Sequence, residues 1–187
     1  MKRYTKQGLW SLFLICAFPL HVWTFLLAFR DFSWVTERTN AWDAVGVMSY
    51  GLVFAFIESL VIFLIATLLG FLIAKAWDAE RRVAVMGHMA LTASLWAVIT
   101  SLFFLIPIHL PPSVIDFLVK QAHPLRILYG VSLVLVGTTV FVPTMLILRS
   151  QPFFRAIQGL FERLAMLTTL YLFFDVVGLV IVILRNV

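Results

Sequence analysis

The sequence predicts an all-α integral membrane protein, built as a bundle of five transmembrane helices. Two observations lead to this fold class. Of the 187 residues, 63% are hydrophobic and only 12% are charged, and the apolar residues gather in five long runs that are bounded by charged residues. A soluble domain is usually about half apolar and about a quarter charged. The chain therefore has too few polar residues to cover a water-soluble particle, which excludes an ordinary soluble enzyme.

The five runs cover residues 8–29, 44–74, 83–108, 127–148 and 164–184. Each reaches the roughly 20 residues that a helix needs to cross a hydrocarbon core of about 30 Å. A helix satisfies its own backbone hydrogen bonds and is therefore the expected conformation in lipid. The second run is longer than one crossing requires, which favours a strong tilt or projection beyond the bilayer. No polar stretch is long enough for a soluble domain, so we expect residues 1–187 to form a single transmembrane domain.

The basic residues predict the orientation of the chain. With a cytoplasmic N-terminus, nine of the fourteen Lys and Arg residues lie in cytoplasmic segments and five lie outside. Cytoplasmic loops of membrane proteins carry an excess of basic residues. The sequence therefore favours a multi-pass protein of the plasma (inner) membrane with its N-terminus in the cytoplasm. The same explanation accounts for the net charge of +5 without nucleic acid as a partner.

Two connecting segments are predicted to form short amphipathic helices at the membrane surfaces. On the external side, residues 114–121 follow Pro111 and Pro112, which favour a helix start. On the cytoplasmic side, residues 150–162 combine arginine with phenylalanine and leucine. Such a mixture is typical of a helix that lies in the interface of a lipid bilayer.

Two carboxylates lie inside the apolar runs. Glu58 is near the centre of the second run and Asp175 is near the centre of the fifth. Burying one acidic group at the bilayer centre costs about 2.5–3.5 kcal/mol on insertion scales. We therefore expect both groups to face the interior of the bundle and to have polar partners.

The partners must be uncharged or titratable groups, because no Lys or Arg occurs within any run. The candidates are His21 in the first run, Trp96 near the centre of the third, and Tyr171, which shares a helical face with Asp175. The sequence predicts a central polar cluster of these three residues with Glu58 and Asp175. These five residues are the candidate ion- or proton-binding residues.

Two hypotheses for the function follow. The first is a non-catalytic subunit of a larger membrane assembly, in contact with lipid and with other membrane proteins or with copies of itself. The alternative is a small transporter or a proton- or ion-coupling subunit that uses Glu58 and Asp175. Small size and short loops favour the first, since five helices rarely enclose a pathway alone. A purely structural interpretation, in which the carboxyl groups hydrogen-bond between helices and fix their packing, is also open.

No catalytic or cofactor signature is present. The chain lacks the GxxxxGK[ST], HExxH and GxSxG motifs, and the single cysteine, Cys16, excludes a disulfide framework. His21 and His88 are expected at different depths, so they do not form a haem-binding pair. We predict no catalytic residue, no metal site and no cofactor. Whether His109 and His123 of the external loop bind anything is left open.

Overall fold

The computed structural model describes residues 3–73, 77–106 and 110–187. These residues form six α-helices, and the model contains no other regular element in the part that it describes. The helices are α1 (Lys6–Arg38), α2 (Ala41–Leu72), α3 (Ala79–Leu105), α4 (Pro112–Val119), α5 (Pro124–Arg149) and α6 (Gln151–Asn186). Five of them are long and apolar enough to cross a membrane, with mean hydropathy between 1.6 and 2.7 in their most apolar stretches. The all-helical class and the number of long apolar helices are confirmed.

The helices differ from the predicted ranges mainly at their ends. α1 continues to Arg38, well beyond residue 29. The predicted external helix at 114–121 corresponds to α4. The predicted ends at residues 74 and 108 lie outside the described residues.

The prediction of a separate amphipathic helix at residues 150–162 is wrong. From Gln151 onward these residues form the first turns of α6, which is one continuous helix of 36 residues. Its start is set by Ser150, whose side chain accepts a hydrogen bond from the backbone N–H of Phe153. No proline follows the first turn, so nothing separates an interfacial helix from the apolar one.

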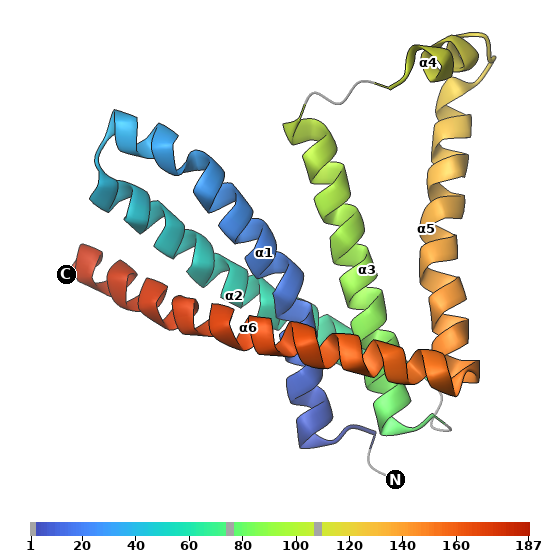
Figure 1. Ribbon diagram of the computed structural model, residues 1–187, viewed down its shortest axis with the longest axis horizontal. Helices are drawn as coiled ribbons and strands as arrows, with labels where there is room; N and C mark the ends of the chain where they lie inside the picture. Colours follow the sequence, from blue (N-terminus) through green and yellow to red (C-terminus); the bar gives the residue numbers. More distant parts are fainter. Residues whose placement is uncertain (1–2, 74–76, 107–109) are drawn as a thin grey trace.

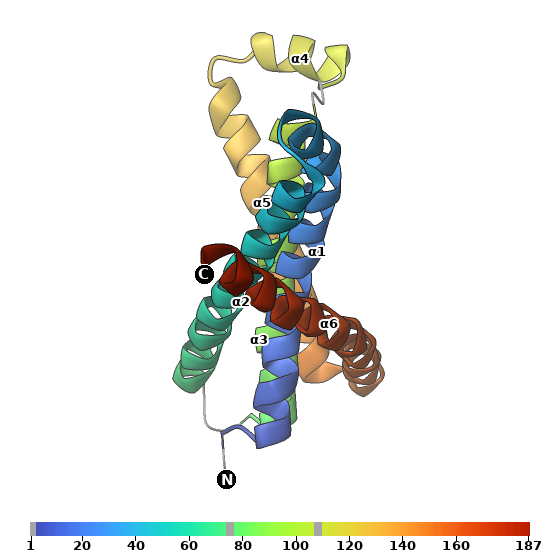
Figure 2. The same ribbon diagram turned by 90° about the vertical axis from the view of Figure 1, so that its left-hand side faces the viewer.

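The helices form two arms that diverge from one end of the molecule (Figure 1). α1, α2 and the C-terminal part of α6 pack together in the first arm, whereas α3 and α5 form the second, with α4 lying across its far end (Figure 1). The first turns of α6 cross the end of the second arm where the arms meet (Figure 1). The arms meet at the N-terminal end of the bundle, by which we mean the end where α1 begins; Figure 2 shows the same end from the side. Within the described residues, α5 contacts α3, α4 and α6 but neither α1 nor α2.

The apolar core lies where the arms meet. Its fully or almost fully buried members include Leu12 and Cys16 from α1, Val85 and Met86 from α3, and Ile147 from α5. Burying apolar surface is the main stabilising term in folding in water, and in lipid close packing takes over much of that role. This junction therefore holds the main cluster of buried apolar side chains in the described residues.

Arg82 ties the junction together, although the sequence suggests only a cytoplasmic loop cation at this position. It is 1% exposed, and its guanidinium donates hydrogen bonds to the carbonyl oxygens of Gly70, Ile73 and Trp77 at 2.5, 3.1 and 3.4 Å. The last carbonyls of a helix lack partners within it, and a positive charge there is favourable. The Tyr4 hydroxyl lies against Gly70, so that a Cβ at this glycine would overlap it. Burial raises the pKa of the Tyr4 phenol, while the charge of Arg82 acts in the opposite direction.

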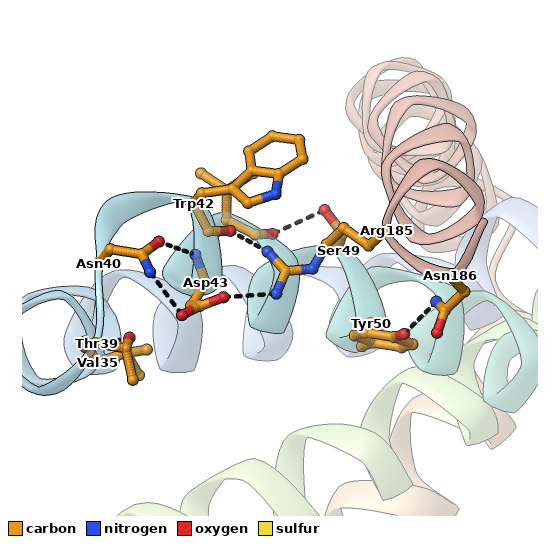
Figure 3. A network of polar contacts seen from close by, with 10 residues as sticks. Val35, Thr39, Asn40, Trp42, Asp43, Ser49, Tyr50, Arg185 and Asn186 are labelled. Carbon is orange, nitrogen blue, oxygen red and sulfur yellow. Dashed lines mark hydrogen bonds and ion pairs between the residues drawn. The ribbon is translucent and has the colours of Figure 1, made fainter.

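A second arginine joins α2 to α6 at the opposite end (Figure 3). Arg185, in the last turn of α6, donates to the carbonyl oxygen of Trp42 at 2.5 Å and to the carboxylate of Asp43 at 2.7 Å. A Cβ at Gly46 would lie 2.5 Å from the Cζ atom of this guanidinium. Gly46 thus provides the space in which the arginine reaches the start of α2.

We predict that Arg82→Leu lowers the free energy of unfolding by about 1–3 kcal/mol, because buried carbonyl groups at the end of α2 lose their donor. The measurement is denaturant-induced unfolding in detergent micelles, followed by circular dichroism. Arg155→Leu is the matched control, since Arg155 is exposed on α6. Equal stability losses in the two variants would contradict the role of Arg82.

Candidate functional site

A buried hydrogen bond between two side chains joins α1 to α6. The Nε2 atom of His21 lies 2.8 Å from Oδ2 and 3.0 Å from Oδ1 of Asp175. His21 is 0% exposed and Asp175 is 7% exposed. We call these two residues the His–Asp pair. It is a titratable pair held near the middle of two long apolar helices.

The sequence of α6 places Asp175 on the packed face of the helix. Its buried residues recur at a spacing of seven and are Phe154, Phe161, Thr168 and Asp175. Residues seven apart lie on one side of an α-helix, so one stripe of α6 faces its neighbours along most of its length. Gly178 follows on the same face, where a Cβ would lie 3.3 Å from the carbonyl oxygen of Ser49. The absence of a side chain at Gly178 lets α6 approach the backbone of α2.

The second nitrogen of His21 shows how the pair is protonated. Nδ1 lies 2.8 Å from the carbonyl oxygen of Ala17, one turn earlier in α1. A carbonyl oxygen can only accept a hydrogen bond, so Nδ1 must carry a hydrogen and donate it. Nε2 faces a carboxyl group, and a hydrogen bond there requires one more proton, on the nitrogen or on an oxygen.

The His–Asp pair therefore holds one shared proton. It exists either as an imidazolium and a carboxylate or as a neutral imidazole and a carboxylic acid, and both forms have zero net charge. Removing the proton would place the lone pair of Nε2 against a carboxylate, or would force the other tautomer and break the bond to Ala17. Either change leaves a buried polar group without a partner, which costs about 1–3 kcal/mol.

Aromatic rings cover the pair on one side. The ring of Tyr171 stacks on that of His21, with centroids 6.2 Å apart and an interplanar angle of 14°. Phe18 and Phe25 pack against Tyr171 in turn, at 6.2 and 5.2 Å. These rings reduce access of water to the imidazole and hold its plane. The aromatic side chains are thus a structural part of the site.

The structure brings together three of the five predicted site residues, namely His21, Asp175 and Tyr171. Glu58 does not join them. It is exposed on α2, while the neighbouring Ser59 is buried, and Glu58 forms no hydrogen bond or ion pair within the described residues. The expectation that both carboxylates face the interior is correct for Asp175 only, because α2 turns Ala55 and Ser59, and not Glu58, toward its neighbours.

Trp96 also lies apart from the pair. Its indole N–H donates to the hydroxyl of Thr139 at 2.9 Å, which links α3 to α5. Trp96 belongs to the second arm of the molecule, and the predicted central cluster therefore separates into two polar contacts. The hydrogen bond to Thr139 gives the indole nitrogen the partner that a polar group in an apolar helix requires.

Sequence reasoning missed two parts of the site. The first is the carbonyl of Ala17, which fixes the tautomer of His21, and a separation of four residues in a helix was the available signal. The second is the aromatic layer of Phe18 and Phe25, whose faces become evident only once α1 and α6 are packed together. No spacing within the sequence relates α1 to α6.

The described residues contain no group of three or more His, Cys, Asp or Glu side chains that could hold a metal ion. His88 lies on α3, where its Nδ1 atom is 3.3 Å from the hydroxyl of Thr92. His109, one of the two external-loop histidines, lies outside the described residues. The hydrogen bonds of the His–Asp pair involve its two side chains and the carbonyl oxygen of Ala17.

We predict that His21 and Asp175 are strongly coupled in stability. His21→Leu and Asp175→Leu should each lower the free energy of unfolding by about 1–3 kcal/mol, because each leaves a buried partner unsatisfied. The double variant should lose much less than the sum, with a coupling energy of about 1–3 kcal/mol. Denaturant unfolding of the four proteins in micelles gives this value.

Asp175→Asn is the conservative control for this cycle. Its amide can donate to Nε2 while His21 keeps its bond to Ala17, so we expect most of the stability to remain. Additive losses in the double Leu variant would show that the two residues do not interact.

Comparison of the chain with protein-family models, with curated proteins and with solved structures gave no match. The functional interpretation therefore depends on the chemistry of the residues described above. The buried His–Asp pair and the exposed Glu58 are the two features that this interpretation must explain.

Proposed function

We propose that the chain is a multi-pass membrane protein and a non-catalytic subunit of a larger membrane assembly. Its five long apolar helices span a plasma (inner) membrane, and its N-terminus lies in the cytoplasm, as the distribution of basic residues favours. Its partners are other membrane proteins or further copies of itself, with lipid around the remaining surface.

The exposed carboxyl group of Glu58 is the observation that carries this proposal. Glu58 lies in the middle of α2, flanked on the helix surface by the exposed apolar residues Phe54, Ile57 and Val61. In contact with lipid alone, an acidic group at this depth costs about 2.5–3.5 kcal/mol on insertion scales. A polar or basic group on a partner helix would offset that cost, which makes this surface of α2 a candidate subunit interface.

The second arm of the molecule supports the same proposal. Only 6% of the most apolar stretch of α5 and 11% of that of α3 are buried within the chain. α5 makes no contact with α1 or α2 in the described part of the chain. Helices in membranes associate by close packing and interhelical hydrogen bonds, so these helices have broad surfaces available for partners.

We expect Glu58→Leu to dissociate the assembly while it leaves the folded subunit intact. The protein, extracted from its native membrane in mild detergent, should form a particle heavier than one 21.3 kDa chain, and the variant should shift toward that mass. Multi-angle light scattering measures the change. Glu37→Leu is the matched control, since it removes an exposed carboxylate at the end of α1.

Two outcomes would contradict this proposal. One is a wild-type particle that contains a single chain. The other is a Glu58→Leu variant that keeps the full assembly and gains stability, as a carboxylate facing only lipid would predict. Glu58→Gln keeps a hydrogen-bonding group of similar size and should retain part of the assembly.

A proton-coupling role is the second candidate function, and the shared proton of the His–Asp pair is the observation that favours it. The sequence suggests Glu58 and Asp175 as the coupling residues, whereas here the coupling residues would be His21 and Asp175. His21 is fully buried and Asp175 is only 7% exposed, beside apolar side chains, so coupling would require a connection between the pair and water. A site that only stores a proton serves helix packing equally well, which is why this candidate ranks second.

For the coupling role we expect Asp175→Asn to remain folded and to abolish proton uptake. Purified protein in liposomes that contain a pH-sensitive dye, under an imposed pH gradient, provides the measurement. Wild-type liposomes that behave like empty ones would contradict coupling by this chain alone. Equal uptake by the wild type and the variant would contradict a role for Asp175.

A further inference from the structure

A groove on the first arm opens beside the His–Asp pair. It has a volume of about 700 Å³ and is formed by α1, α2 and α6. Its walls are apolar, with Trp10, Phe13, Phe56 and Phe63 as the large aromatic members. The polar or charged exceptions are Lys6, at the start of α1, and Asp175. Binding sites for small molecules have comparable volumes and mostly apolar walls.

The groove runs from the start of α1 to the middle of the bundle. On α2 the lining runs from Val53 to Phe63, which is about 15 Å of helix and extends to both sides of Glu58. Lys6 is the first residue of α1, at the level of the headgroups when α1 spans the membrane. Along α1, His21 lies about 22 Å further on, so that its partner Asp175 marks the depth of the bilayer centre.

Lys6 is available to a ligand. It is exposed and forms no hydrogen bond or ion pair within residues 3–73, 77–106 and 110–187. The nearby Arg3, by contrast, donates to the carbonyl oxygen of Phe71 at 2.5 Å. An ammonium group at the mouth of an apolar groove matches a ligand with an anionic head and a hydrocarbon tail.

We propose that this groove binds an anionic phospholipid of the leaflet at the N-terminal end of the bundle. The phosphate pairs with Lys6, and one acyl chain lies along Trp10 and Phe13 and covers the exposed edge of Asp175. The proposal depends on the membrane placement proposed above, and it does not depend on the subunit interface at Glu58.

Trp10 provides a reporter inside the groove. The protein is reconstituted into two kinds of phosphatidylcholine vesicle. One contains a fixed fraction of brominated phosphatidylglycerol, and the other contains the same fraction of brominated phosphatidylcholine. One lysine near an anionic headgroup supplies about a fivefold preference. We therefore expect brominated phosphatidylglycerol to quench tryptophan fluorescence more strongly than brominated phosphatidylcholine does. The occupancy of the groove by phosphatidylglycerol should be up to about fivefold higher.

The variants separate the groove from the general surface. The excess quenching should disappear in Trp10→Phe, which lacks the reporter, and in Lys6→Gln, which lacks the charge. Arg155→Gln is the matched control and should keep the excess, since Arg155 is an exposed cation on α6 outside the groove lining. Leu60→Phe, which fills the groove, should reduce the number of phosphatidylglycerol molecules retained in native mass spectrometry.

Equal quenching by the two brominated lipids would overturn the proposal, as would an excess that Lys6→Gln leaves unchanged. Flotation of the vesicles on a density gradient distinguishes these results from failure of the membrane placement itself. Protein that does not float with the vesicles contradicts the placement, whereas protein that floats without lipid preference contradicts only the groove. Circular dichroism of each variant confirms that the helices are retained.

Discussion

A buried carboxyl group in an apolar helix must have a hydrogen-bonding partner, and this requirement fixes the position of α6. Asp175 finds that partner in His21, and His21 is held in turn by the carbonyl of Ala17. The contact sets the rotation of α6 about its axis and its register against α1. Gly178 then brings the same face of α6 against the backbone of α2, so Asp175 and Gly178 both contribute to the position of this helix of 36 residues.

The two arginines apply the same requirement to the helix ends. A helix ends with carbonyl groups that lack partners, and Arg82 satisfies those of α2 from inside the junction. Arg185 lies at the C-terminal end of α6, where positive charge is favourable, and Asp43 lies at the N-terminal end of α2, where negative charge is favourable. Between Arg82 and Arg185, apolar side chains of α1, α2 and α6 pack against one another and hold the first arm together. Arg82 of α3 is thus the tie between the second arm and α2, and the two arms diverge away from this junction (Figure 1).

The sequence was sufficient for those features that depend on neighbours along the chain. Apolar length predicted the five long helices, and Pro111 and Pro112 predicted the start of α4. Features that depend on the packing of one helix against another could not be predicted from the sequence. The depth of Glu58 could be read from the sequence, but its direction could not, because Glu58 and the buried Ser59 are adjacent and only packing decides which one turns inward. Arg82 shows the same limit, since a cation at a helix start looks the same in sequence whether it faces water or the end of another helix.

Glu58 and Asp175 together indicate how the molecule divides its polar groups between its own interior and its surroundings. Both lie near the centre of an apolar helix, and the physical cost of an unpaired carboxyl group there is similar for both. The chain meets that cost for Asp175 with a histidine from α1, and it offers nothing comparable for Glu58 within the described residues. The five apolar runs contain no basic residue, and Glu58 lies on an exposed apolar surface of α2, so in the proposed membrane placement its partner would come from another molecule. The same reasoning applies at Lys6, an unpaired cation beside an apolar groove. In the proposed membrane placement, the first group would take a protein partner at the bilayer centre and the second an anionic lipid at the surface, because depth decides which kind of molecule can supply the matching polar or charged group.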